Sequence, residues 1–272
     1  MATFFGEILP VTSRAVDDDE DEDDVTTAST IDPVVQWTNH LTTDVEKLQG
    51  QKIPCTVFII ALGIEANAFS DIYLKPFGYE PVGEILTSSK EETALSQSST
   101  NDKTCVVNRC RSNPSVFLCQ CRADILPEHS FVWAKLLNDT FDLSSSDIII
   151  LTSSGMSGYC SDLPFSDLET PLLRCLKTES FTGSLKCKIL EQPNMVTGFA
   201  AQLMTFCQVY GYKAVTYVCF KEKRYMDIAD IKAFIPVLQT NAVKDITEVN
   251  KNAEQMLRDV VKLHSLHDMM YM

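Results

Sequence analysis

The sequence predicts an α/β protein in which helices cover both faces of a largely parallel sheet. Two observations carry this prediction. Four short segments are almost continuously apolar and rich in β-branched residues, as strands buried on both faces are. Segments with helical spacing of apolar residues lie between them, and strands that alternate with helices form βαβ units whose strands are parallel.

The four predicted strands read CTVFIIAL, SVFLCQC, DIIILT and KAVTYVCF. They cover residues 55–62, 115–121, 147–152 and 213–220. The first of them stops at Gly63, where a residue without a side chain ends the apolar run. An amphipathic segment at 34–48 precedes these strands.

The clearest helix is expected to begin after Pro193, with Asn194 as its cap, and to end at Gly211. Its apolar residues recur at intervals of three and four, which places them on one face. These residues are Val196, Phe199, Ala200, Leu203, Phe206, Cys207 and Tyr210.

The chain is predicted to divide into a flexible acidic arm at 1–32, a single α/β domain at 33–264 and a tail at 265–272. Asp17 to Asp24 form an unbroken acidic run, and eight like charges repel one another and cannot pack. We interpret the arm as solubilising, with a docking element as the alternative. The polar residues 84–104 are predicted to form a surface loop or insertion within the domain.

Composition and charge exclude several classes of protein. A net charge of −14 argues against nucleic acid or an anionic membrane as a partner, since both require a cationic surface. No 18 consecutive residues are apolar, so no membrane-spanning helix is expected.

The ten cysteines are irregularly spaced, and the chain has neither a CxxC pair nor a recognisable signal peptide. We therefore expect a cytoplasmic protein with buried thiols, such as Cys119 and Cys121 on one face of a strand, rather than disulfides or a metal site.

Enzymatic function receives little support from the sequence. In α/β sheets, ligands bind beyond the carboxyl ends of the strands. Gly63 stands there alone, without a phosphate-binding motif, and Ser153–Gly158 (SSGMSG) lacks the spacing of a nucleophile elbow. None of the four histidines lies near a candidate nucleophile in sequence. We therefore predict no catalytic residue, no cofactor and no metal, and we interpret SSGMSG as a plain loop, with a catalytic loop as the alternative.

The C-terminal region combines an amphipathic helix with a short terminal motif. The apolar face of the helix consists of Ile246, Val249, Ala253, Leu257, Val260 and Leu263. Residues after Leu266 are expected to lie beyond this helix, and the sequence ends in Met270, Tyr271 and Met272. A tyrosine with an apolar ring and a polar tip, next to a carboxylate, suits a narrow pocket that contains a lysine. A frayed terminus is the alternative.

Several segments resemble the proteasome assembly chaperone family. They are MATFFGE followed by an acidic run, CTVFIIALG, SNPSVFLCQC (112–121), LRCLKT (173–178) and LEQPN (190–194), together with Tyr271. The resemblance implies a three-layer α/β/α sandwich like the nucleoside-phosphorylase-like folds, without a known catalytic role. Kinship of fold alone does not confer an activity.

The resemblance also implies a function and its partners. It implies a heterodimer with proteasome assembly chaperone 2 that binds the proteasome alpha-type subunits 5 and 7. The heterodimer would promote assembly of the alpha ring of the 20S proteasome and prevent premature dimerisation of alpha rings. The C-terminal hydrophobic-Tyr-any motif, here Met270, Tyr271 and Met272, would enter a pocket between neighbouring alpha subunits. The resemblance further allows an association with the endoplasmic reticulum. The alternatives are a generic protein-binding adaptor and a nucleoside-processing enzyme.

Overall fold

The computed structural model describes residues 33–38, 41, 50–86, 105–122, 124–125, 127–161, 163–164, 167–222, 225–247 and 250–270, the last six by their backbone alone. The predicted acidic arm, residues 87–104 of the predicted loop, and Tyr271 and Met272 lie outside the described residues.

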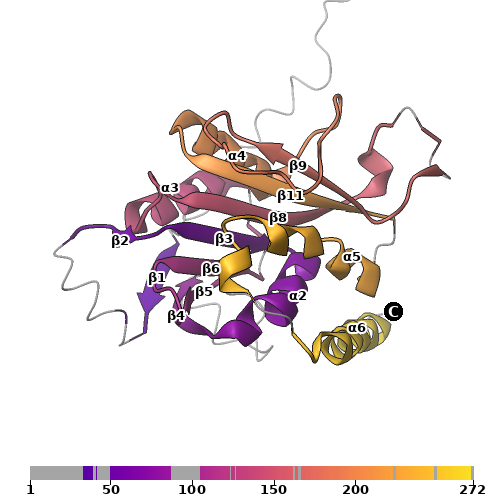
Figure 1. Ribbon diagram of the computed structural model, residues 1–272, viewed down its shortest axis with the longest axis horizontal. Helices are drawn as coiled ribbons and strands as arrows, with labels where there is room; N and C mark the ends of the chain where they lie inside the picture. Colours follow the sequence, from indigo (N-terminus) through magenta and orange to yellow (C-terminus); the bar gives the residue numbers. More distant parts are fainter. Residues whose placement is uncertain are drawn as a thin grey trace, which may run out of the picture. The chain divides into compact units, whose positions relative to one another are not determined.

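Nine strands of the described chain form one sheet in the order β1-β4-β5-β6-β3-β8-β11-β9-β10. Its centre consists of β6 (Val116–Cys121), β3 (Val57–Leu62), β8 (Asp147–Gly155) and β11 (Lys213–Lys221), which are mutually parallel (Figure 1). These are the four strands that the apolar runs predict. The sequence prediction is therefore confirmed for the parallel centre of the sheet.

Antiparallel strands, which the sequence pattern did not reveal, flank the parallel centre. On one side, β5 (Cys105–Cys110), β4 (Tyr79–Leu86) and β1 (Val34–Trp37) continue the sheet from β6. On the other side, β9 (Leu172–Lys177) runs antiparallel to β11, and the short β10 (Lys188–Ile189) pairs parallel to β9. All of these strands except β1 carry charged residues, and β4 also carries a proline and a glycine, so their sequences resemble those of loops.

Helices cover both faces of the sheet, which confirms the three-layer α/β/α architecture. α3 (Ser130–Thr140) and α4 (Gly198–Val209) lie on one face, and α2 (Ile64–Tyr73), α5 (Ile228–Lys232) and α6 (Ala253–Met270) lie on the other (Figure 1). The described chain also contains a separate parallel pair, β2 (Ile53–Pro54) and β7 (Phe141–Asp142), and short 3-10 helices at Lys75–Phe77, Pro127–His129, Met156–Gly158, Ile235–Gln239 and Lys244–Ile246. No helix in the described part of the chain is long and apolar enough to cross a membrane.

The central strands are continuously apolar because both of their faces are buried. Successive side chains of a strand point to opposite faces. Along β3, Phe58 and Ile60 pack with Trp133 of α3, whereas Ile59 and Ala61 join the core on the side of α2. All five side chains are almost completely buried. The resulting two cores, one on each face of the sheet, account for the absence of an alternating pattern in these strands.

Two predicted boundaries are wrong. Residues 84–86 belong to β4 rather than to a loop, because they pair with β1 and β5. α4 begins at Gly198 with Thr197 as its N-cap, not at Asn194. The Asn194 side chain instead binds the backbone of Cys160, accepting its N–H at 2.7 Å and donating to its carbonyl at 2.8 Å. Asn194 therefore joins two loops rather than capping a helix.

The predicted end of α4 at Gly211 is confirmed. Gly211 has a φ of 71°, in the left-handed region that glycine adopts readily. Its N–H donates to the carbonyl of Gln208 at 3.2 Å, and the N–H of Tyr212 donates to the carbonyl of Cys207 at 2.8 Å. These two hydrogen bonds form a Schellman motif, which satisfies the last carbonyls of the helix.

Candidate functional site

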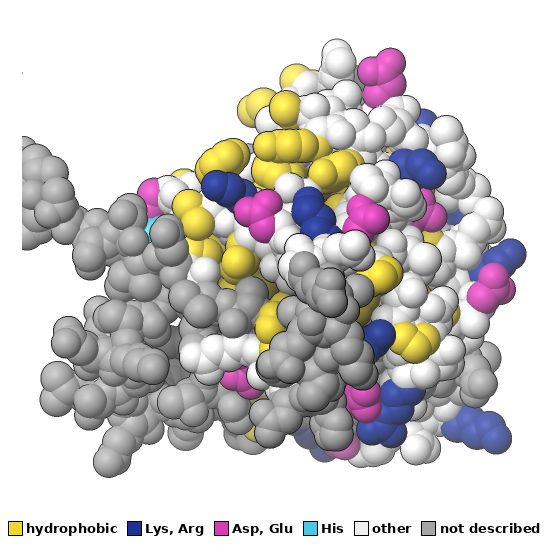
Figure 2. Space-filling model, turned by 90° about the vertical axis from the view of Figure 1, so that its left-hand side faces the viewer, with side chains coloured by type: hydrophobic (Ala, Val, Ile, Leu, Met, Phe, Trp, Pro, Cys, Tyr) yellow, Lys and Arg dark blue, Asp and Glu magenta, His cyan; other side chains and the backbone are white. Residues whose placement is uncertain are grey.

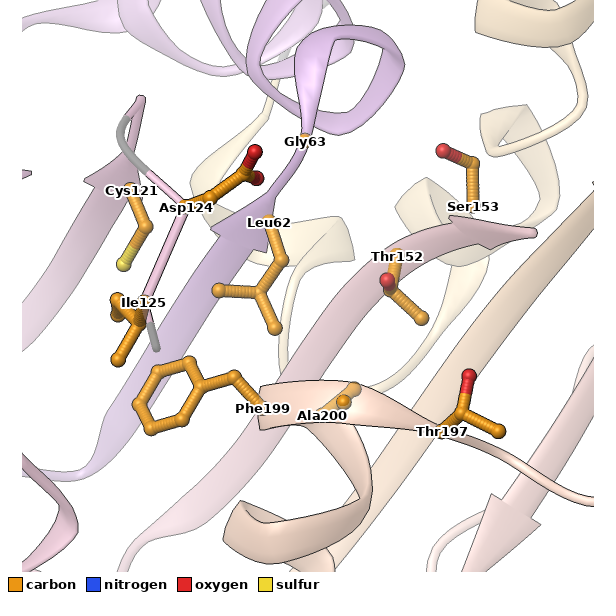
Figure 3. Close-up of a pocket in the computed structure, with 11 residues that line it drawn as sticks. Leu62, Gly63, Cys121, Asp124, Ile125, Thr152, Ser153, Thr197, Phe199 and Ala200 are labelled. Atoms are coloured by element: carbon orange, nitrogen blue, oxygen red, sulfur yellow. The ribbon is translucent and has the colours of Figure 1, made fainter. Parts of the chain in front are cut away.

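A pocket of about 320 Å³ lies at the carboxyl ends of β3, β6 and β8, next to the N-terminus of α4 (Figure 3). The chain leaves β3 into α2 on one face of the sheet and leaves β6 toward α3 on the other. The crevice between two such strands is where an open α/β sheet binds ligands. The lining residues are Leu62, Gly63, Cys121, Asp124, Ile125, Thr152, Ser153, Thr197, Gly198, Phe199 and Ala200.

Much of the wall of this pocket is apolar. Figure 3 shows Ile125 and Phe199 close together with Leu62 beside them, while Thr197 and Ser153 lie toward the other side. Beneath the pocket, the Asn67 side chain donates to the carbonyls of Gly63 and Cys121, both at 2.8 Å, and so holds the ends of β3 and β6 together. The lining therefore combines an apolar wall with one carboxylate, that of Asp124, and with hydroxyl groups such as those of Thr197 and Ser153.

The polar end of the pocket is occupied by hydrogen bonds within the protein. Ser153 Oγ donates to Glu65 Oε2 at 2.6 Å, and Glu65 Oε1 forms an ion pair with Lys221 Nζ. The side chain of Glu65 is 2% exposed and that of Lys221 is 13% exposed. Glu65 lies in the first turn of α2, where the helix dipole also favours a negative charge. The cluster therefore joins the ends of β8 and β11 to the start of α2.

This cluster differs chemically from an activated nucleophile. A serine becomes nucleophilic when an adjacent base accepts its proton. Here the Ser153 hydroxyl donates to Glu65, whose charge is balanced by Lys221. None of the lining residues that the structure describes is a histidine, lysine or arginine. The described lining thus offers no imidazole and no cation for a phosphate.

The SSGMSG segment is only partly the loop that the sequence predicts. Ser153 to Gly155 form the end of β8, and Met156–Gly158 is a 3-10 turn. Its position at the carboxyl edge explains why Ser153 lines the pocket.

Eight of the ten cysteines are buried, as predicted, whereas Cys160 is exposed and Cys187 is half-buried. Cys119 and Cys121 are both buried on the same face of β6, with their Sγ atoms 3.9 Å apart. Hydrogen bonds from Cys105 and Cys119, with burial, raise the pKa of the Cys121 thiol well above its usual range, although Cys121 lines the pocket. Burial also raises the pKa of Cys207 to about 12. All ten cysteines are free, and the described residues contain no cluster of three or more potential metal ligands.

Two of the segments that carry the family resemblance meet in one polar network. Arg174 of LRCLKT donates through Nε to both carboxylate oxygens of Glu191 of LEQPN at 2.8 Å. Tyr159 Oη donates to the same carboxylate at 2.8 Å, and the guanidinium lies 6.0 Å from the Tyr159 ring centroid. Burial opposes ionisation of Glu191, but the hydrogen bonds from Arg174 and Tyr159 outweigh it and lower the pKa of the carboxyl. The network connects β9 to the segments that follow β8 and β10.

The predicted proteasome-binding residues lie at the end of α6. Met270 is the last residue of that helix, and Tyr271 and Met272 lie outside the described residues. The expectation that residues after Leu266 lie beyond the helix is therefore wrong. No glycine or proline occurs between Ala253 and Met270 to end the helix, and leucine and methionine favour it.

α6 is held at its start and exposed farther along. Leu257 is fully buried against the core, and Asn250 Nδ2 donates to the carbonyl of Ile72 in α2 at 2.7 Å. Lys232 of α5 and Glu254 form an ion pair of 2.6 Å. Leu263, two turns farther along, is 69% exposed, so only the first part of the predicted apolar face packs on the domain. The start of α6 is therefore fixed on the domain, and Met270 lies at the other end of the helix.

Sequence reasoning missed the Glu65, Ser153 and Lys221 cluster. The available signal was the presence of opposite charges immediately after two predicted strands, Glu65 after 55–62 and Lys221 after 213–220. It also missed Arg174 and Glu191 as a pair, which nothing in their local sequence reveals.

Comparison with known proteins gives a consistent result. A family model described as "Proteasome assembly chaperone 4" matches residues 1–272. Proteasome assembly chaperone 1 of Xenopus laevis is 29% identical over 287 residues, covering 100% of both chains. The protein of the same name from Danio rerio is 32% identical over 251 residues, covering 88% of this chain and 90% of that protein.

Solved structures support the fold. A Thermoplasma acidophilum protein of unknown function has a TM-score of 0.56 at 12% identity, covering 86% of this chain and 94% of its own. Pyrococcus furiosus PbaB, described as an archaeal proteasome activator, has a TM-score of 0.55 at 11% identity, covering 89% of this chain and 100% of its own. The resemblance to nucleoside-phosphorylase-like folds is not confirmed by these comparisons.

Proposed function

Because the chain belongs to the proteasome assembly chaperone family, we propose that it promotes assembly of the 20S proteasome alpha ring and prevents alpha-ring dimerisation. It acts in the cytoplasm as a heterodimer with proteasome assembly chaperone 2 and binds the alpha-type subunits 5 and 7. The observation that carries this proposal is the match to the family over the full length of the chain. A chaperone of this kind stabilises one arrangement of subunits by binding it better than the alternatives, and needs no catalytic step.

In this function, Met270, Tyr271 and Met272 enter a pocket between neighbouring alpha subunits. The course of α6 supports this role, since its first turns are anchored on α2 and α5 and its later turns lead toward these residues. Tyrosine provides most of the contact area, because its ring is apolar and its hydroxyl can form one hydrogen bond.

Deleting Tyr271 and Met272 tests the role of the tail. Loss of an aromatic anchor at an interface typically costs about 2 kcal/mol or more, so alpha-ring binding should weaken by roughly 30-fold. The thermal midpoint should stay unchanged, because the deleted residues follow α6. The measurement is a pull-down of alpha rings at graded concentrations, with a thermal melt of each variant.

Three further variants sharpen this test. Tyr271→Ala should resemble the deletion, and Tyr271→Phe should bind better than Tyr271→Ala. Several residues appended after Met272 should weaken binding although every native side chain remains. Binding to proteasome assembly chaperone 2 should survive all of these changes. If truncated and extended proteins bind alpha rings as the wild type does, the role of the tail is refuted.

The polar cluster at the pocket supports a structural role for these residues within a non-enzymatic protein. Ser153 and Lys221 both bind the carboxylate of Glu65. In a chaperone, such a cluster maintains the fold that carries the binding surfaces.

A further inference from the structure

A second surface, separate from α6, is a groove of about 410 Å³ between α3 and α4. Phe131 of α3 is 61% exposed and Val209 of α4 is 76% exposed along it. Figure 2 views the molecule from the side where α3 lies in Figure 1, and hydrophobic side chains gather in the upper part of that face. Large exposed apolar groups that adjoin one another mark an interaction site more often than scattered ones do.

The aromatic side chains at this groove form a continuous, supported row. The ring centroids of Phe131 and Phe206 are 6.3 Å apart, those of Phe206 and Tyr210 are 4.4 Å apart, and those of Tyr210 and Tyr212 are 5.7 Å apart. Tyr212 Oη donates to Asn138 Oδ1 of α3 at 2.7 Å, which holds one end of the row in place. Rigid aromatic side chains lose little conformational entropy on binding, and aromatic residues are enriched at the energetic centre of interfaces.

The groove carries no charge within its described lining. α4 contains no charged residue in its twelve positions, and the charged residues of α3, Lys135 and Asp139, are not among the lining residues. Thr205 of the lining already has a partner, since its Oγ1 donates to the Ala201 carbonyl at 2.9 Å, and Gln208, beside the lining, accepts through Oε1 from the Glu179 N–H at 3.0 Å. An uncharged aromatic centre with a polar rim is the composition of a protein interface. Covering this surface would leave these groups hydrogen-bonded.

We infer that the α3/α4 groove is the surface that binds the second chaperone of the heterodimer, through an uncharged apolar helical face on that partner. This inference rests on the proposed function. The groove lies on the face of the sheet opposite α6, so both surfaces can be occupied at once, as a dimer that holds an alpha ring requires. A second copy of this chain is a poor occupant, because each copy brings a net charge of −14 and like charges oppose association.

The test uses Phe131→Glu and Val209→Glu in the full chain, each co-expressed with tagged proteasome assembly chaperone 2. A charge buried without a partner at an interface centre should weaken copurification by about 30-fold or more. Met195→Glu is the matched control, because Met195 is 78% exposed but does not line the groove, and it should bind as the wild type does. Val209 projects from the helix surface, so Val209→Glu should keep the wild-type thermal midpoint even if Phe131→Glu loses stability.

The outcomes separate the two proposals. Loss of the complex in the groove variants, with Met195→Glu and the thermal midpoint of Val209→Glu unaffected, supports the inference. If the wild type binds chaperone 2 and Val209→Glu binds it equally well, the groove is not the interface. If the wild type does not bind chaperone 2 at all, the proposed heterodimer itself fails. A homodimer of the wild type in light scattering that Val209→Glu dissociates would identify a second copy as the occupant and overturn the inference.

Discussion

The ion pair between Lys221 and Glu65 should be the polar contact whose disruption costs the domain most stability. Lys221→Met removes the ammonium and leaves the Glu65 carboxylate, 2% exposed, without its counter-charge. Removing one partner of a buried pair typically costs about 3–5 kcal/mol. For a domain of this size each kcal/mol lowers the thermal midpoint by roughly 2–4 °C. The expected decrease is therefore about 6–20 °C.

The converse change should cost less. Glu65→Gln leaves an amide oxygen that can still accept the Ser153 hydroxyl, which lies 2.6 Å from the carboxylate in the native structure. The ammonium left behind belongs to Lys221, whose side chain is 13% exposed and whose long stem can carry the charge toward water. The double variant, with both changes, should recover most of the stability that Lys221→Met loses, because no unpaired charge remains buried.

The assay is urea denaturation and thermal melting of the two single variants, the double variant and Lys213→Met, analysed as a double-mutant cycle. Lys213 is the exposed lysine at the other end of β11, and its substitution should change stability by no more than about 0.5 kcal/mol. The reasoning is refuted if Lys221→Met costs less than about 1 kcal/mol, or if the double variant is as unstable as Lys221→Met.

Two further predictions concern the buried thiols and the network of the family segments. Changing Cys119 and Cys121 together to serine should lower the free energy of unfolding by about 2–6 kcal/mol, because it buries two hydroxyl groups in an apolar core. Alpha-ring binding should be preserved at a permissive temperature, and a folded double variant that no longer binds would contradict this. Glu191→Gln should lower the thermal midpoint at neutral pH. Because the pKa of Glu191 is lowered from its ordinary 4.5, its charge stabilises the fold above pH 4.5, and this contribution is lost as the pH falls below 4.5. The difference in thermal midpoint between wild type and Glu191→Gln should therefore shrink as the pH falls below 4.5, and a constant difference would contradict the assignment.

The sequence alone determined those elements whose burial or conformation is visible in their own residues. β3, β6, β8 and β11 are recognisable because both faces of each strand are buried, so every position along them is selected to be apolar. The end of α4 at Gly211 is equally local, since it depends on one residue that adopts a positive φ. The acidic run and the terminal Met270, Tyr271 and Met272 are visible in the sequence alone, and their roles remain predictions.

The tertiary structure decided the strand order and the contacts between distant segments. β4 and β9 flank the parallel centre, and their charged residues conceal them in the sequence. The partners Glu65 and Lys221 are separated by 156 residues and meet only because β3, β8 and β11 are parallel neighbours whose carboxyl ends share one edge. The exposed Phe131 and Val209 lie on helices that also contribute apolar residues to the core, so only the packing of α3 beside α4 shows which apolar residues remain uncovered. The spacing of apolar residues along a helix or strand indicates which of its faces are buried. Which elements pack against those faces depends on the path of the whole chain.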